Sequence, residues 1–105
     1  MATTTKALAR TAASTSAGTT LYTQPNTSTI TIVTNVVVCN TTTSAATATV
    51  TLGGVDLLNA ASIAANSTAF FDIKQVIPAS NPAKTITGSA STTGVNFHIS
   101  GVEVA

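Results

Sequence analysis

The sequence predicts an all-β fold: a single antiparallel β-sandwich of about seven strands, Ig-like or jelly-roll-like, with an extended N-terminal arm. Three observations predict it. Val, Ile and Thr, whose branched side chains suit a pleated sheet better than a helix, are abundant. Apolar and polar residues alternate in short runs separated by turn residues. Finally, no residue between Arg10 and Asp56 is charged, yet hydroxyl and amide groups interrupt every apolar run well short of the roughly 20 residues that a membrane helix needs.

Length and charge restrict the number of domains and the kinds of partner. The 105 residues make one domain, with an extended arm over residues 1–18 and a β-sandwich over residues 19–105. Hydrophobic residues make up 44% of the chain but aromatic residues only 4%, so the core must be aliphatic. Charged residues make up 7%, against roughly 25% in an ordinary globular protein, and the net charge is +1. Nucleic acid and anionic membranes are therefore not expected partners, since clustered Lys and Arg capture both.

The first residues carry no pattern that would bury one face. Residues 1–18, MATTTKALARTAASTSAG, are of low complexity, and we expect an extended arm that is either disordered or ordered by a neighbour. A short strand is predicted over residues 19–23, and the turn Gln24-Pro25-Asn26 ends it.

The longest predicted strand covers residues 28–40. One parity places Ile30, Ile32, Val36 and Val38 on one face, and the other parity holds Val33, Val37 and Cys39. After a polar turn over residues 40–44, Ala and Val alternate with Thr over residues 46–52, which predicts a half-buried strand with a Thr ladder facing outward. Gly53-Gly54 then predicts a two-residue hairpin turn into a strand over residues 55–58.

The last half of the chain predicts three further strands. Residues 59–67 are expected to form a loop anchored by Ile63, and residues 68–73 a strand. Residues 74–83 read as a turn region whose Val76 and Ile77 close one end of the core. Residues 85–92 and 95–104 form a final antiparallel pair, in which Gly101 marks a bulge that lets Val102 and Val104 continue inward.

Side chains able to perform acid–base, nucleophilic or metal chemistry are few, and they do not cluster in the sequence. They are Cys39, Asp56, Asp72, His98 and Glu103. Their spacing fits no metal site, and no nucleophile elbow or phosphate-binding Gly-rich loop is present. His98 and Glu103 are five residues apart on one strand and therefore face opposite sides unless the Gly101 bulge resets the parity. We predict no catalytic, cofactor-binding or metal-binding residue, no cofactor and no enzymatic activity.

Several other residues have a structural interpretation. Cys39 is expected to be a small buried hydrophobe, and Asp72 and Lys74 to share one solvated face where they could pair. Tyr22 is expected to close the rim of the core with its hydroxyl in water, or else to contact a sugar or peptide. No apolar segment follows Lys6 and Arg10, so we expect no secretory signal and a protein made in a cytoplasm. The glycosylation triplets at Asn26, Asn40 and Asn66 are then without consequence.

Three segments in this order resemble small virion structural proteins of tailed bacteriophages: LYTQPNTSTITIVTNVVVCNTTTSAATATVTLGGVDLL, then SIAANSTAFFDIKQVI, then VNFHISGVEV. In those chains a strand ending in V-V-x-N leads to a Thr/Ala strand, a Gly-Gly hairpin and a P/A-A-N-S-T turn, and a short I-S-G-V-E closes the chain. The resemblance covers roughly residues 19–104. Ala64-Ala65 stands where the family usually has a proline, which is a mild departure.

The resemblance implies a non-enzymatic protein of the virion that decorates and stabilises the assembled capsid. Its implied partners are the major capsid protein and further copies of itself, with a trimer expected by analogy alone. Charge-poor, Thr-rich strand faces suit such packing, because they lack the usual protection against association. The implied subunit-bridging arm includes the following residues: Thr3, Thr4, Thr5, Lys6, Leu8 and Arg10.

Two other interpretations stay open. One is a tail or head-fibre component, such as a receptor- or glycan-binding module with an exposed aromatic cluster around Tyr22. The other is a secreted adhesin or carbohydrate-binding domain, which the missing signal peptide disfavours. The sequence by itself does not distinguish a capsid location from a tail or fibre location.

Overall fold

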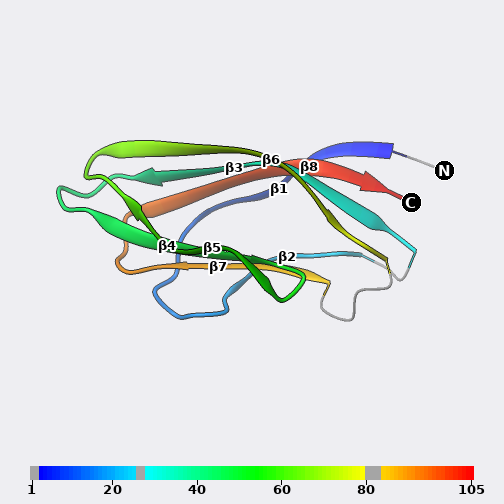
Figure 1. Cartoon of the computed structure of the whole chain (residues 1–105), viewed down its shortest axis with the longest axis horizontal. Coiled ribbons are helices and arrows are strands. Elements are labelled where there is room, and N and C mark those ends of the chain that lie inside the picture. The colour runs from blue at the N-terminus through cyan, green and yellow to red at the C-terminus, as the bar shows by residue number, and fades with distance from the viewer. Residues whose placement is uncertain (1–2, 26–27, 80–83) are drawn as a thin grey trace.

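The computed structural model describes residues 3–25, 28–79 and 84–105, and these residues form two four-stranded antiparallel sheets packed face to face (Figure 1). The predicted all-β sandwich is therefore confirmed. The described strands are β1 (Thr3–Ala12), β2 (Thr20–Thr23), β3 (Ile30–Asn40), β4 (Ala46–Leu52), β5 (Val55–Ile63), β6 (Ser67–Ile77), β7 (Thr85–Ala90) and β8 (Val95–Val104).

The strand order identifies the sandwich as a jelly roll. Sheet A has the order β1-β8-β3-β6 and sheet B the order β2-β7-β4-β5. The pairs β1·β8, β2·β7, β3·β6 and β4·β5 are the rungs of one long antiparallel hairpin. Rolling that hairpin brings β3 beside β8 and β4 beside β7. This arrangement of eight strands distinguishes a jelly roll from an Ig-like sandwich.

The N-terminal segment is extended, and most of it lies in sheet A. Thr3–Ala12, which the sequence analysis assigned to an arm outside the sandwich, forms β1 and pairs antiparallel with β8. This strand raises the number among the described residues from about seven to eight. Leu8, Ala9 and Ala13 are buried in the core, so the expectation that this segment buries no face was wrong. Alternation of apolar and polar residues does not reveal this buried face, because Leu8 is the extra residue of a β-bulge. The bulge places the consecutive side chains of Leu8 and Ala9 inward.

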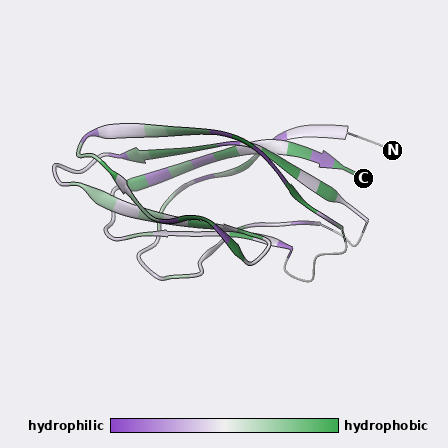
Figure 2. Cartoon of the chain, viewed as in Figure 1, coloured by the Kyte–Doolittle hydropathy of each residue, from purple (hydrophilic) through white to green (hydrophobic). Residues whose placement is uncertain are grey.

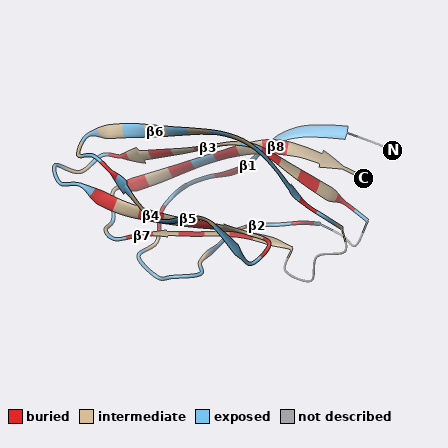
Figure 3. Ribbon diagram, viewed as in Figure 1, coloured by how far each residue is buried: buried red, intermediate tan, exposed pale blue. Residues whose placement is uncertain are grey.

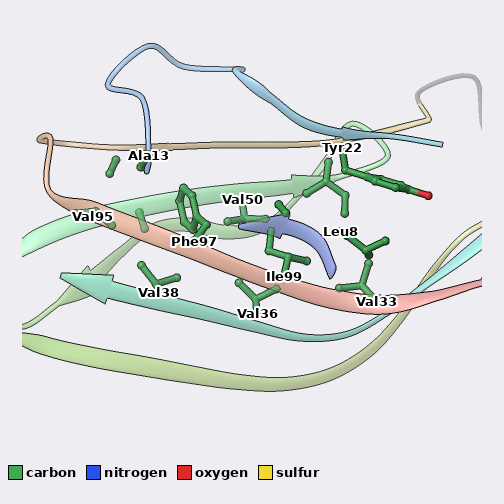
Figure 4. Close-up of a cluster of buried hydrophobic side chains, with 14 of the residues drawn as sticks. Leu8, Ala13, Tyr22, Val33, Val36, Val38, Val50, Val95, Phe97 and Ile99 are labelled. Carbon is green, nitrogen blue, oxygen red and sulfur yellow. The ribbon is translucent and has the colours of Figure 1, made fainter. Parts of the chain in front are cut away.

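The core between the sheets is aliphatic and small, as the composition predicts (Figure 4). Val95, Phe97 and Ile99 project from β8 and are fully buried. The Phe97 ring lies over Gly88 of β7, where a Cβ atom would stand 3.2 Å from a ring carbon and 2.7 Å from the Leu21 side chain. A glycine at this position makes room for the largest fully buried side chain of the core.

A β-bulge at Thr34 divides β3 into two halves of opposite parity. The register against β8 shifts by one residue between Val33 and Asn35. Val33 is inward before the bulge, and Val36 and Val38 are inward after it. The prediction that placed Ile30 and Ile32 on the same face as Val36 and Val38 was therefore wrong, because strict alternation does not continue through a bulge.

Gly101 lies within a regular part of β8, and the bulged residues are on its two neighbours, β1 and β3. The parity of β8 is thus unbroken, so Glu103 follows Gly101 on the inner side while Val102 and Val104 face outward. The prediction of inward Val102 and Val104 was wrong for this reason. Gly101 is required by contact: a Cβ atom there would lie 2.3 Å from the Ile32 carbonyl oxygen.

Strands β5 and β6 extend further than predicted. Residues 59–63, expected in a loop, continue β5 and pair with Ala46–Ala48 of β4, across an irregularity where Ala60 has a φ of 49°. Residues 74–77, expected in a turn, continue β6 and pair with the first half of β3. Ile77 is buried as predicted, but Val76 is 53% exposed. The Gly53-Gly54 hairpin is confirmed, with both φ angles positive and Leu52 opposite Val55.

Candidate assembly surfaces

The residues predicted for the arm all lie on β1, an edge strand of sheet A. Residues 3–6 and Arg10 are exposed, whereas Leu8 is buried and contributes to the core. Lys6 forms an ion pair with Glu103 of the neighbouring strand at 3.5 Å. Arg10 lies opposite the exposed His98 and has no hydrogen-bond or ion-pair partner among the described residues. The polar part of this segment therefore lines one edge of the sandwich.

A polar network closes the sandwich beside Lys6. The Tyr22 hydroxyl donates a hydrogen bond to a Glu103 carboxylate oxygen and is 3.0 Å from the Thr31 hydroxyl, which donates to Gln24 Oε1 at 2.7 Å. Burial, together with the Glu103 carboxylate, raises the pKa of Tyr22 to about 12. Gln24 Nε2 is buried and has no partner among the described residues.

Tyr22 is therefore a structural residue rather than a ligand contact. Its side chain is 8% exposed, and its hydroxyl is bonded within the protein, not in water as expected. Among the described residues, the exposed aromatic cluster that would have indicated a glycan-binding module is not formed around it.

Five aliphatic side chains share the outer face of sheet A near the C-terminus. The register places Val102 between Thr5 and Ile32, Ile32 beside Val76, and Val104 beside Ile30. We call the following five residues the outer aliphatic patch: Ile30, Ile32, Val76, Val102 and Val104. None is fully buried, and Figure 2 shows the hydrophobic stretches of β3 and β8 at this end of the sheet.

The other half of the same face combines polar and apolar residues. Arg10, His98, Val37 and Phe70 form one row across β1, β8, β3 and β6. Phe70 is 74% exposed at the end of this row. Arg10, Asn96 and His98 line an open hollow of about 430 Å³. His98 faces outward and Glu103 inward, so these two residues lie on opposite sides of the sheet, because the predicted bulge at Gly101, which would have reset the parity, is not formed.

The outer edges of the sandwich carry most of the remaining charge. Figure 3 shows the exposed residues along β1 and β6, in contrast to the alternating buried positions of β3 and β8. Asp72 and Lys74 both lie exposed on β6, but the ion pair expected between them is not formed within 4.0 Å. Both charges are thus free for other partners.

Asn40 has a structural role, and Cys39 departs from the role expected for it. The Asn40 side chain is 1% exposed, and its amide donates to the carbonyls of Ser44, Ile63 and Ala64 while its oxygen accepts two bonds from Thr42. An amide held in this way joins two turns and is closed to glycosylation. Cys39 is a half-buried free thiol on the outer face of sheet A, not a core residue. The Asn26 triplet lies outside the described residues.

Within residues 3–25, 28–79 and 84–105, no three His, Cys, Asp or Glu side chains gather in a way that could hold a metal ion. In the same ranges, no helix is long and apolar enough to cross a membrane. What the described surface does offer is the outer aliphatic patch and two charged strand edges.

The sequence matches no protein-family model and no curated protein. Among solved structures, the chain is similar to a chain in the structure of infectious bursal disease virus Gx strain, with a TM-score of 0.48 and 16% sequence identity. The match covers 97% of this chain and 32% of that chain, so this chain spans about a third of its neighbour's length.

Proposed function

We propose that this protein is a non-enzymatic structural protein of a tailed-phage virion, which decorates the capsid and stabilises it by binding in many copies. The outer aliphatic patch is the observation that carries the proposal. Contiguous apolar patches on a solvent-facing surface mark interaction sites, and these five β-branched side chains form such a patch. The sequence resemblance supplies the kind of assembly, and the patch supplies a surface with which to join it.

The proposed partner of the patch is the major capsid protein of the shell. Burial of apolar area would drive the contact at about 25 cal/mol per Å². Because the patch itself contains no charge, docking would require no buried ion to be compensated. A protein that binds the assembled shell and not its free subunits stabilises the shell by mass action, and the effect grows with the number of copies bound.

The edge strand β1 would make the second contact, in the bridging role expected of the arm. Its exposed Thr3, Thr4 and Thr5 and the free Arg10 can reach a neighbouring subunit, while Leu8 holds the strand to its own core. Deleting residues 1–18 would damage that core and does not test the role. Arg10→Glu, with Arg10→Lys as control, changes the exposed edge and leaves the core intact. Weaker particle binding by Arg10→Glu alone supports bridging, and equal binding by both variants contradicts it.

Copy number per particle tests the proposal most directly. Quantitative mass spectrometry of purified virions, referenced to the major capsid protein, should give hundreds of copies for a protein that covers the shell. Absence from the particle would overturn the virion role altogether.

A second experiment tests the patch itself. Ile32→Asp and Val102→Asp should abolish binding of the purified protein to particles, because a carboxylate would be buried against the shell without a partner. Ser62→Asp is the matched control, since Ser62 is exposed on the other sheet. Binding unchanged in the two patch variants would assign the shell contact to another surface.

A tail or head-fibre component is the alternative, and the hollow beside Arg10 is the observation that favours it. The Arg10, Asn96 and His98 side chains that line it could donate hydrogen bonds to an acidic glycan. A copy number of a few to a few dozen, with binding to host cells lost in Arg10→Ala, would favour this alternative over decoration.

A further inference from the structure

Strand β6 is an exposed edge strand. The pattern of its outward side chains is complementary to the same pattern read in the opposite direction. Its even-numbered residues share the outer face of sheet A, because Phe70 is paired with Val37, Asp72 with Asn35 and Val76 with Ile32. Reading along the strand, Phe70, Asp72, Lys74 and Val76 are apolar, acidic, basic and apolar, and all four are exposed. The centre of this pattern is Ile73.

We propose that two copies of this chain pair through β6, antiparallel about a two-fold axis at Ile73. In this register Asp72 lies opposite Lys74 of the second copy, and Lys74 opposite Asp72. Phe70 likewise lies opposite Val76 of the second copy, in both directions. Each contact occurs twice, as a two-fold interface requires, and the two A sheets join into one eight-stranded sheet.

Charge complementarity identifies a second copy as the occupant of this edge. Asp72 and Lys74 are exposed, and neither has a hydrogen-bond or ion-pair partner among the described residues. Opposite charges directly across an antiparallel pair stabilise the pairing, as do aromatic and β-branched pairs. The pairing also covers Phe70 and Val76, which are 74% and 53% exposed in the single chain. Both are among its most exposed large hydrophobic side chains.

The other three sheet edges are poorly suited to self-pairing. Both charged residues of β1, Lys6 and Arg10, are cationic, so a β1–β1 pair brings like charges together. Strand β2 has only four residues. Strand β5 is interrupted by two register shifts and by the positive φ of Ala60. Short, bulged or cationic edges are the usual protections against edge-to-edge association. Strand β6 is neither short nor cationic, since it has 11 residues and mixed charge. It has one register shift, against β3, where Ile73 and Lys74 lie opposite Thr34.

This inference rests on the proposed function for its biological role, but its test uses the purified chain and needs no particle. A monomeric chain that still decorates virions would overturn the pairing alone, and a dimeric chain absent from virions would overturn the proposed function alone.

Charge exchange across the axis is the decisive experiment. Sedimentation velocity across a concentration series should show a dimer for the wild type. Asp72→Lys and Lys74→Asp should each weaken the dimer about tenfold, because each creates two like-charge pairs at the axis. The double variant Asp72→Lys/Lys74→Asp restores opposite charges and should recover wild-type affinity. Asp56→Lys, a matched charge change on β5, should leave it unchanged.

Several outcomes would overturn the pairing. They are a wild type that stays monomeric at every concentration, single variants that dimerise normally, and a double variant that fails to recover. A trimer or an open-ended series would require a heterologous contact, such as β6 against β1 of the next copy, and would also overturn it.

A cross-link tests the register independently. Residue 73 is the only position of β6 that meets its own copy in the proposed register. In a Cys39→Ser background, Ile73→Cys should form an intermolecular disulfide on mild oxidation. Phe71→Cys, the matched variant on the same face of β6, lies opposite Gln75 and should form far less. Equal cross-linking at both positions would contradict the register even if a dimer is present.

Discussion

The Tyr22 hydroxyl donates a hydrogen bond to the Glu103 carboxylate and so joins β2 of sheet B to β8 of sheet A across the end of the core. The two residues are 81 positions apart in the chain. Lys6 of β1 pairs with the same carboxylate, and Thr31 of β3 contacts the same hydroxyl. Four strands thus meet in one polar cluster at the end of the sandwich that also carries the outer aliphatic patch.

Removing the Tyr22 hydroxyl should destabilise the fold. Tyr22→Phe keeps the ring but leaves Glu103 and Thr31 without this partner in a largely desolvated site. We expect the free energy of unfolding to fall by about 1–3 kcal/mol, measured by urea denaturation. Thr11→Val, which removes an exposed hydroxyl, is the control and should change little. Equal stability of Tyr22→Phe and the wild type would show that the cluster contributes no net stabilisation.

Stability should decrease at high pH because of the same residue. The pKa of Tyr22 is raised from 10.0 to about 12 in the folded state. The neutral phenol therefore contributes stability that is complete below pH 10 and is lost as the pH rises from about 10 through about 12. Denaturation of the wild type and Tyr22→Phe across this range isolates the effect, since lysine titration is common to both. A difference between the two that does not shrink with pH contradicts the assignment.

Adding a methyl group at Gly101 should cost far more than adding one at Gly88. The new Cβ atom would lie 2.3 Å from a backbone carbonyl at Gly101, whereas at Gly88 its nearest neighbour is the end of the Leu21 side chain. We expect Gly101→Ala to lower the free energy of unfolding by at least about 2 kcal/mol, by overpacking. Gly88→Ala should cost less, and Leu21→Ala should relieve part of it. Similar costs at both sites would mean that β8 can shift away from β3.

Two replacements of Asn40 should show how much its hydrogen bonds, as distinct from its packing, contribute to the stability of the fold. Asn40→Ala removes the donors to three carbonyls, and we expect a loss of about 2–3 kcal/mol. Asn40→Asp keeps the shape but turns a carboxylate toward the same three carbonyls, so it should cost more at neutral pH. Because protonation restores a donor, the Asp variant should recover relative to the wild type as the pH falls toward 4. If the Asp variant does not recover at low pH, the hydrogen bonds around residue 40 have rearranged in that variant.

Local patterns predicted several elements well. The alternation of Ala and Val with Thr identified β4, and the Gly53-Gly54 pair identified the hairpin with both positive φ angles. Both depend on neighbouring residues alone, as turn geometry and side-chain alternation do. The short strand before Pro25 and the pair of strands at the C-terminus were predicted on the same basis.

The surfaces were predicted less well, since they depend on strand pairing. The bulge at Thr34 reverses the parity of β3 and moves Ile30 and Ile32 to the outer face. The regular register of β8 keeps Val102 and Val104 outward beside them. Neither outcome can be predicted from the sequence of one strand alone. For β1, the adjacent Leu8 and Ala9 in an otherwise Thr-rich segment were a signal that this strand could enter the core.

The sequence by itself determined that this protein is an all-β sandwich with an aliphatic core and few charges, because branched side chains, alternation and turn residues act locally. The tertiary structure alone decided the jelly-roll order, the place of β1 at a sheet edge, and the outward direction of the outer aliphatic patch. Those features follow from register between strands far apart in the chain, where one bulged residue exchanges the two faces of a sheet.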